Sequence, residues 1–279
     1  MKAKLLFLAG LFLALGVAFT SCDDDDNDIN PGKQYTDALQ AKYPDARNVK
    51  WENKDGYTVA DFTLNGVVKR AWYNSSVQEV MTETGTNFDA LPVAIRNSYG
   101  QNPYAQWYRD DVSQVQLLTT NTNVYTIAIK QDKRDMVLVY LEDGTLIKTG
   151  INMDKDTEYL PVSAQIQGIV NDKLPGSVVY LVYKGDENIN AVALQNGIYQ
   201  TVTMNNQFQW LKTSYETTWD ALPDIVKTSY QASSYNGLTI YQIDDVQSPA
   251  GHYYWFVLQS GDAFQAIMIN DQGAITQDR

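Results

Sequence analysis

The chain contains one histidine, His252, and one cysteine, Cys22, so chemistry that needs an imidazole or a thiolate depends on these two side chains. A hydrolytic triad or a histidine–metal site needs further groups around the imidazole, either a nucleophile and an orienting acid or additional ligands. His252 ends an SPAGH segment at 248–252, which is typical of a loop before a strand at 253–259, where a single histidine is usually solvated. We therefore expect no catalytic residue, no metal site and no cofactor, and we expect that the protein is not an enzyme.

Paired carboxylates are the other groups suited to acid–base chemistry, and they occur at Asp110-Asp111 and Asp244-Asp245. Glycoside hydrolysis needs two carboxylates about 5 to 10 Å apart across a cleft, whereas adjacent residues on a strand point to opposite faces. We interpret both pairs as solvated turns. The acids of the segment 154–158 lack the glycine turn of a calcium loop, so we interpret that segment as a linker.

Cys22 follows a segment with the layout of a secretory leader. Residues 1–4 carry two lysines, residues 5–19 are apolar and uncharged, and a Thr-Ser pair precedes the cysteine. The apolar run is shorter than the roughly 20 residues that span a bilayer as a helix, which disfavours the alternative of an uncleaved anchor helix. Residues 1–21 resemble a lipoprotein signal peptide that ends in a lipobox, and this resemblance implies lipidation at Cys22.

An acidic run follows the cysteine, with five aspartates among residues 23–28. Like charges at this density repel one another and stay extended, so residues 22–33 are interpreted as a lipidated tether. Such a run resembles the surface-export signal of lipoproteins in some Gram-negative bacteria, which implies the outer membrane and exposure at the cell surface. The formal net charge of −12 excludes a basic nucleic-acid footprint and means that lipid, not surface charge, holds the protein to a membrane.

An internal duplication organises the rest of the chain. The FDALP segment at 88–92 returns as WDALP at 219–223, and Asn-Gly at 65–66 returns at 196–197, both 131 positions later. Two halves are expected from this offset, 34–151 and 152–279. Leu-Pro pairs at 91–92, 160–161 and 222–223 predict short helices, because proline is favoured in a first helical turn.

Short strand-like runs follow each predicted helix. In the first quarter they cover 49–52, 57–64, 67–73 and 77–83, and the Asp-Gly at 55–56 and Asn-Gly at 65–66 between them are typical of tight hairpins. The predicted fold class is α+β, with tandem repeats of one helix followed by a four-stranded antiparallel meander. One side of an antiparallel sheet can face solvent, so we expect the helices to cover one side only.

These features resemble those of the PepSY-like, beta-lactamase-inhibitor-like (BLIP-like) lipoproteins. The resemblance rests on the leader, on the (F/W)-D-A-L-P helix starts with a trailing Ser-Tyr, and on the helix-then-meander units, in two copies that cover the chain after the tether. It implies secreted or lipid-anchored α+β units with a curved sheet whose open side could hold a protein or peptide. It implies no cofactor and no catalytic residue.

Strand alternation then selects a candidate binding face. Trp51 and Trp107 are expected in the core under the helices, while Trp72 and Tyr108 should point to the opposite side, together with Tyr199 in the second half. Exposed tryptophan and tyrosine are good anchors for protein contacts. The alternative is that these aromatic residues are also buried, since a shift of register by one residue inverts the assignment.

The function expected from the sequence is therefore binding, not catalysis. The leading hypothesis is a surface lipoprotein that binds a protein or peptide through an open sheet face and thereby inhibits a peptidase or another hydrolase. The alternative is a glycan-binding accessory protein of the cell envelope, because aromatic rings also stack on sugars.

Overall fold

The computed structural model describes residues 28–278 apart from 133, 152, 186 and 262. The predicted signal peptide, Cys22 and most of the acidic run lie outside the described residues. The chain divides into two compact units, residues 1–161 and 162–279. The boundary expected at 151/152 lies ten residues before this division. The difference arises because the segment 154–159 packs against side chains of the first unit.

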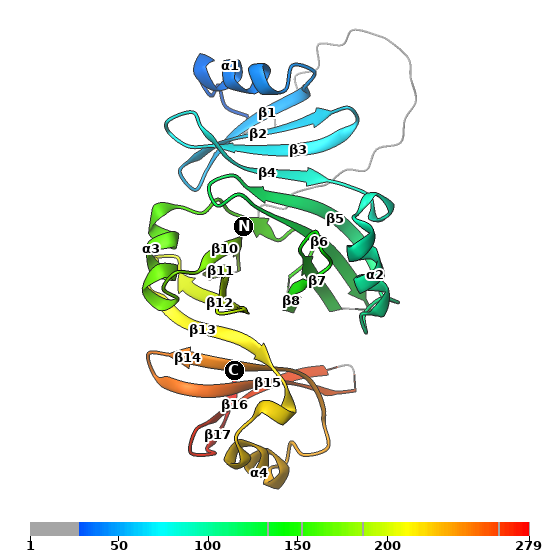
Figure 1. The fold of residues 1–279 in the computed structure, drawn as a ribbon, viewed down its shortest axis with the longest axis vertical. Helices are drawn as coiled ribbons and strands as arrows, with labels where there is room; N and C mark the ends of the chain where they lie inside the picture. Colours follow the sequence, from blue (N-terminus) through cyan, green and yellow to red (C-terminus); the bar gives the residue numbers. More distant parts are fainter. Residues whose placement is uncertain (1–27, 133, 152, 186, 262, 279) are drawn as a thin grey trace. The chain divides into compact units, whose positions relative to one another are not determined.

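The first unit is one antiparallel sheet whose eight strands lie in chain order, with two helices on it (Figure 1). Helix α1 precedes β1–β4, and a single 3-10 turn (Phe88–Ala90) with helix α2 precedes β5–β8. A two-residue strand, β9 (Glu158–Tyr159), follows. The bounds are α1 Lys33–Lys42, β1 Arg47–Lys54, β2 Tyr57–Leu64, β3 Val67–Tyr73, β4 Glu79–Gly85, α2 Val93–Gln101, β5 Tyr108–Leu117, β6 Thr122–Gln131, β7 Arg134–Tyr140 and β8 Leu146–Ile151.

The second unit has the same order of elements. Helix α3 precedes β10–β13, and a 3-10 turn (Trp219–Ala221) with helix α4 precedes β14–β17; these strands are antiparallel and neighbour one another in chain order. The bounds are α3 Ala164–Lys173, β10 Val178–Lys184, β11 Asn188–Gln195, β12 Ile198–Asn205, β13 Trp210–Thr217, α4 Asp224–Ala232, β14 Thr239–Ser248, β15 Gly251–Ser260, β16 Ala263–Asn270 and β17 Ile275–Asp278. The described residues are therefore α+β, with antiparallel sheets and four α-helices.

Tight turns fix the register of the hairpins. Asn65 and Gly66 between β2 and β3 have φ of 51° and 81°, and Asn196 and Gly197 between β11 and β12 have φ of 52° and 81°. Two consecutive positive φ values define the turn whose twist matches that of the strands. Asparagine and glycine adopt this backbone at low cost, so these pairs set which residues face each other across both hairpins.

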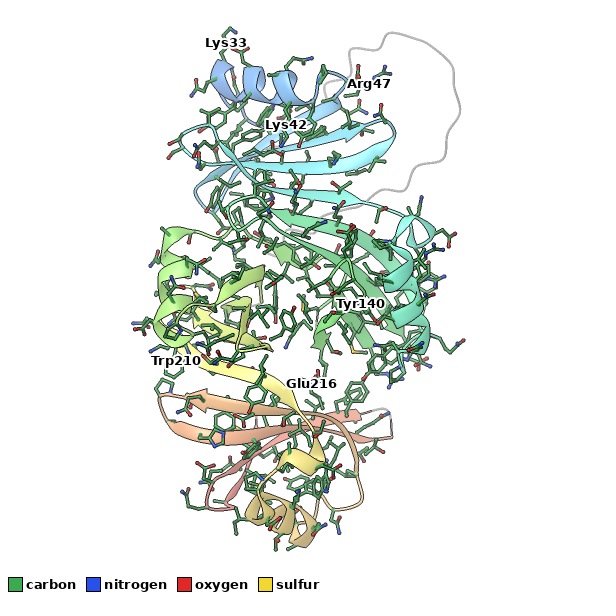
Figure 2. All side chains as sticks on the ribbon, in the orientation of Figure 1. Lys33, Lys42, Arg47, Tyr140, Trp210 and Glu216 are labelled. Atoms are coloured by element: carbon green, nitrogen blue, oxygen red, sulfur yellow. The ribbon has the colours of Figure 1, made fainter. Side chains whose placement is uncertain are left out.

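Helix α1 packs on one side of β1–β3. The core under it contains Leu39 from the helix and Trp51, Phe62 and Tyr73 from the strands. Lys42, at the end of α1 (Figure 2), lies with its Nζ 2.6 Å from Oε2 of Glu79 and so joins the helix to β4. The expectation that Trp51 lies under a helix is confirmed.

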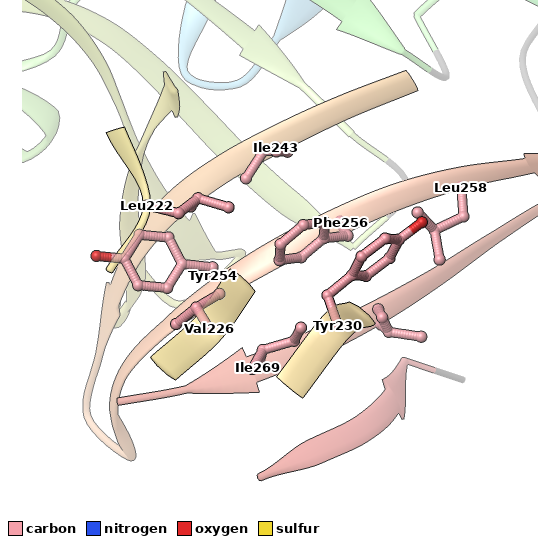
Figure 3. Close-up of a cluster of buried hydrophobic side chains, with 9 residues drawn as sticks. Leu222, Val226, Tyr230, Ile243, Tyr254, Phe256, Leu258 and Ile269 are labelled. Carbon is pink, nitrogen blue, oxygen red and sulfur yellow. The ribbon is translucent and has the colours of Figure 1, made fainter. Parts of the chain in front are cut away.

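Helix α4 covers the C-terminal strands in the same way (Figure 3). Leu222, Val226 and Tyr230, spaced by four, are all buried, and the Tyr230 ring is stacked on Phe256 at 5.4 Å between centroids. In the first unit Leu91, Ile95 and Tyr99 are buried in the corresponding way at α2. We call the helix-covered side of each sheet its helix side and the opposite side its open side.

No helix among residues 28–278, as far as they are described, is long and apolar enough to cross a membrane.

Candidate functional site

Trp72 points to the open side of the first sheet, as strand alternation predicts, but it is not exposed. Its neighbours Ala71 and Tyr73 belong to the core under α1, so Trp72 faces the other way. Its exposed fraction is 0%. The prediction that Trp72 forms part of an exposed binding face is therefore wrong.

The burial of Trp72 has a local cause. Its cross-strand neighbours Val59 and Met81 are both fully buried, and the Tyr57 ring meets the indole edge-on at 5.9 Å. The indole Nε1 donates a hydrogen bond of 3.0 Å to Oε1 of Glu83. Buried tryptophan usually finds such an acceptor, so Trp72 is a second core residue on the open side of the sheet.

Tyr108 is exposed on the open side of the first sheet, with 64% of its surface accessible. The next residue, Arg109, lies over the Phe88 ring at 4.0 Å on the helix side, so Tyr108 points away from α2. Lys130 faces Tyr108 across the β5–β6 ladder, with its Nζ 5.0 Å from the ring centroid and 2.8 Å from Oδ1 of Asp110. The structure thus places Tyr108 where the sequence predicted it, next to charged side chains.

Tyr199 lies in the second unit near the start of β12. It faces Leu194, which in turn faces Val178, and Val178 is 44% exposed. The Tyr199 ring itself is half-buried and meets Tyr180 edge-on at 5.5 Å. Tyr199 thus belongs to a small, partly accessible apolar row.

Trp107 differs from the expectation that it lies in the core. It precedes β5 and is only half-buried, with Tyr104 edge-on at 5.3 Å and the Arg134 guanidinium 4.9 Å from its ring centroid. Its contacts come from a loop and a strand end, because β5 begins one residue after it.

A polar pocket occupies the open side of the first unit. Arg70, only 8% exposed, donates from Nε and Nη2 to the two carboxylate oxygens of Asp61 at 2.7 and 2.8 Å. A carboxylate oxygen of Glu52 lies 3.6 Å from Nη2 of the same guanidinium. The side chains lining the pocket are those of Lys54, Arg70, Glu83, Asp111, Ser113, Thr126, Ala128 and residues 154–159.

Glu83 is the most perturbed acid of this pocket. Burial raises its pKa from 4.5 to about 7, although Arg70 and the hydrogen bond from Trp72 act in the opposite direction. The pKa of Arg70 is raised, since its hydrogen bonds to Asp61 and the surrounding negative charges outweigh the effect of burial. The pocket therefore holds a permanent cation among acids, one of which titrates near neutrality.

The segment 154–159 closes the pocket. Nζ of Lys155 lies 3.8 Å from Oδ2 of Asp110, and Nζ of Lys54 lies 3.3 Å from Oε2 of Glu158. The sequence predicts that this segment is a linker between halves, and the structure shows in addition that its charged residues cover polar side chains of the first sheet.

The two carboxylate pairs lie within strands and not in solvated turns, so that expectation is wrong. Asp110 is the extra residue of a bulge in β5, and Asp111 accepts a hydrogen bond of 2.9 Å from Ser113. Asp244 in β14 is buried and accepts a hydrogen bond of 2.7 Å from Gln242. Bulges and side-chain partners let these strands hold acids that the sequence pattern assigned to turns.

His252 lies in strand β15 between two aspartates, and the expectation of a solvated loop histidine is also wrong. Its Nε2 is 2.9 Å from Oδ1 of Asp245 and its Nδ1 is 2.6 Å from Oδ1 of Asp271. A general base needs a ring nitrogen that is free to take a proton, and here carboxylates occupy both nitrogens. In the described part of the chain, no group of three or more His, Cys, Asp or Glu residues is placed to hold a metal ion.

No family model matches the chain. No curated protein matches it either. Among solved structures, a BLIP-like protein from Bacteroides fragilis NCTC 9343 is 29% identical, covers 50% of this chain and 100% of its own, and gives a TM-score of 0.46. A DUF2874 family protein from Bacteroides ovatus ATCC 8483 is 32% identical, with 44% and 89% covered and a TM-score of 0.42. A DUF2874 family protein from Bacteroides uniformis ATCC 8492 is 23% identical, with 48% and 97% covered and a TM-score of 0.42.

Proposed function

We propose that the protein is a non-catalytic binding module that holds a protein or peptide on the open side of its sheets. The observation that carries the proposal is Tyr108, an aromatic ring 64% exposed on a rigid strand, with Lys130 beside it and Asp110 paired to that lysine. Aromatic anchors with adjacent charged groups dominate the energy of protein interfaces. The half-buried Tyr199, with Leu194 and the exposed Val178, is the proposed contact row in the second unit.

The scaffold of this module is proposed to be a tandem pair of PepSY-like, BLIP-like units. Turns with matching backbone angles lie 131 positions apart, and the order of helices and strands is the same in both units. Gly144 and Gly273 each lie against the helix of their own half, α2 at Ala94 and α4 at Ser229. These correspondences support a duplication of the chain.

Binding is favoured over catalysis by the surroundings of the titratable groups. Both ring nitrogens of His252 bind carboxylates, and Arg70 is held by Asp61. Hydrolysis that uses histidine as the base would need a free ring nitrogen next to a nucleophile. We therefore propose inhibition of a peptidase or another hydrolase as the effect of binding, and no reaction of the chain's own.

Attachment through lipid on Cys22 is proposed from the leader, with the outer membrane and the cell surface as the location. We expect the Cys22→Ala variant to lose metabolic palmitate labelling and to leave the membrane fraction. Changing Asp23–Asp26 to asparagine is the matched control, since it keeps the lipid and should alter only the accessibility of the protein to added protease on intact cells. A Cys22→Ala protein that still sediments with outer membranes would contradict the anchor.

The binding face is tested with the chain from residue 23 immobilised and exposed to envelope and secreted proteins of the producing bacterium. Captured proteins are quantified for the unchanged chain, for Tyr108→Ala, for Tyr199→Ala and for the double variant. We expect at least about a tenfold weaker capture of the specific partner by the double variant, because a buried aromatic anchor contributes about 2 kcal/mol or more.

Val93→Ala and Ile225→Ala are the matched controls, since these side chains are 61% and 47% exposed but lie on helices α2 and α4. Both variants should capture the partner as well as the unchanged chain does. A partner that binds the Tyr108/Tyr199 double variant as well as the unchanged chain excludes the surfaces at Tyr108 and Tyr199 as its binding sites. Retention of glycans in place of proteins on an array, lost in the same double variant, would assign the face to sugar binding.

A further inference from the structure

The cluster around His252 joins four neighbouring elements of the second unit. Asp245 comes from β14, His252 from β15 and Asp271 from the turn between β16 and β17. Tyr215 of β13 donates its hydroxyl proton to the second oxygen of Asp245 at 3.0 Å. The imidazole thus stands at the centre of a chain of hydrogen bonds across the sheet.

The geometry favours a protonated imidazole between two ionised carboxylates. A carboxylate can only accept hydrogen bonds, so both ring nitrogens must donate, and only the imidazolium carries a proton on each. With the ring neutral, one nitrogen would present a lone pair to a carboxylate oxygen 2.6 or 2.9 Å away. Loss of one proton therefore removes one of the two bonds.

The bond to Asp271 is the one that a neutral ring gives up. The Asp245 side chain is only 20% exposed, so little water can replace the imidazole there. The Asp271 side chain is 50% exposed, so water can replace the imidazole there. Asp271 belongs to the turn that closes on α4, because a Cβ at Gly273 in that turn would collide with the Ser229 side chain.

At the corresponding place in the first unit an amide, Asn123, stands where the imidazole stands in the second unit. Gln114 of β5 faces Tyr125 across the ladder as Asp245 faces Tyr254, and the Gln114 amide donates to Oδ1 of Asn123 at 3.0 Å. An amide pair does not titrate between pH 5 and 9. The chain thus contains its own counterpart of the cluster, in which an amide pair replaces Asp245 and the imidazole.

We propose that Asp245, His252 and Asp271 form a proton-operated clamp that fastens the β16–β17 turn to the sheet and to α4, and that releases this turn when His252 loses its proton.

The sign of the effect follows from the groups that face His252. Burial lowers its pKa, but hydrogen bonds to Asp271 and Asp245 and their negative charges outweigh burial, so its pKa lies above the ordinary value of 6.5. A folded-state pKa above the unfolded one gives stability that is complete below pH 6.5 and is lost as the pH rises through the folded value. Tyr215, with a pKa raised by burial to about 12, and Tyr254, whose pKa burial also raises, do not titrate in that window.

The proton NMR spectrum of the chain from residue 23 gives a direct test, since its one histidine gives one imidazole Hε1 signal. We expect this signal to titrate with a pKa above 6.5 in the unchanged chain and at a lower value in Asp271→Asn. A midpoint at or below 6.5 in the unchanged chain, or no change in Asp271→Asn, overturns the clamp.

Amide hydrogen exchange distinguishes a clamp that opens with pH from an ion pair that has no effect on the turn. After correction for intrinsic exchange rates, we expect the protection factor of amides in the 268–277 peptide to fall at least about threefold between pH 6 and pH 8.5. The protection factor of the 139–146 peptide of the first unit should not change over this range. The double variant Asp245→Gln/His252→Asn transplants the amide pair of the first unit and should remove this pH dependence while the unit stays folded. Equal pH dependence in the double variant, or none in the unchanged chain, refutes the proposal.

Discussion

Replacing Trp72 by alanine is expected to lower the free energy of unfolding of the first unit by about 3 to 5 kcal/mol, the usual cost of removing a buried large aromatic side chain. Trp72 is fully buried between Val59 and Met81 on the open side of the sheet. The change would also leave the Glu83 carboxylate without its indole donor, which adds the cost of an unsatisfied buried acceptor. Urea unfolding followed by circular dichroism measures the loss.

Tyr108→Ala is the control for this prediction, because Tyr108 lies on the same side of the same sheet but is 64% exposed. Surface substitutions of this kind usually change stability by less than about 0.5 kcal/mol. Trp72→Phe should fall between the two, since it keeps an aromatic ring and loses only the hydrogen bond and part of the volume. Equal unfolding midpoints for Trp72→Ala and the unchanged chain would mean that Trp72 is not a core residue.

Local sequence signals predicted the strands and turns well where turn chemistry is specific. The Asp-Gly and Asn-Gly pairs placed the ends of β2 and β3 at the observed residues, 57–64 and 67–73. Helix positions followed from residues spaced by four, such as Leu222, Val226 and Tyr230, which are buried together. Both signals act within a few residues of each other, so the sequence alone contains them.

Depth of burial on the open side could not be predicted in the same way. Alternation assigned Trp72 to the correct side, but whether that side is covered depends on long-range packing, here on Tyr57 and on strand β4. Alternation distinguishes two faces and says nothing about what lies over each of them. Residues 154–159 line the pocket of the first sheet, and this contact also depends on packing between segments that are far apart in the sequence.

The Asp245–His252 pair could have been found from the sequence. A tight turn at 248–251 places Gln247 opposite His252 and Asp245 opposite Tyr254, so Asp245 is the diagonal neighbour of His252 on the same face. The SPAG sequence is typical of a longer loop, whereas Ser248 faces Gly251 in the structure and the segment forms a tight hairpin turn. Asp271 could not have been placed in this way, since it reaches His252 from the turn after β16.

Arg70→Met is expected to be the second strongly destabilising change, by about 3 to 5 kcal/mol at pH 7, the usual cost of leaving a buried charge without its partner. The substitution keeps the aliphatic length and removes the guanidinium that binds Asp61 at 2.7 Å and lies near Glu52. Since Arg70 lowers the pKa of Glu83, which burial raises to about 7, its loss should raise that pKa further. The variant should therefore regain stability as the pH falls toward 5, because a Glu83 whose folded-state pKa lies above its unfolded value takes up a proton on folding.

The double variant Arg70→Met/Asp61→Leu separates the guanidinium's charge from its packing. Replacing both members of a buried ion pair by apolar residues is often neutral or stabilising, whereas removing one leaves its partner without compensation. We therefore expect the double variant to recover most of the stability that Arg70→Met loses, as measured by urea unfolding at pH 7. Lys33→Met, which removes one member of the exposed Lys33–Asp37 pair, is the control and should leave the midpoint unchanged. If Arg70→Met were as stable as this control, the guanidinium would hold no acids in place, and the pocket would be an ordinary solvated surface.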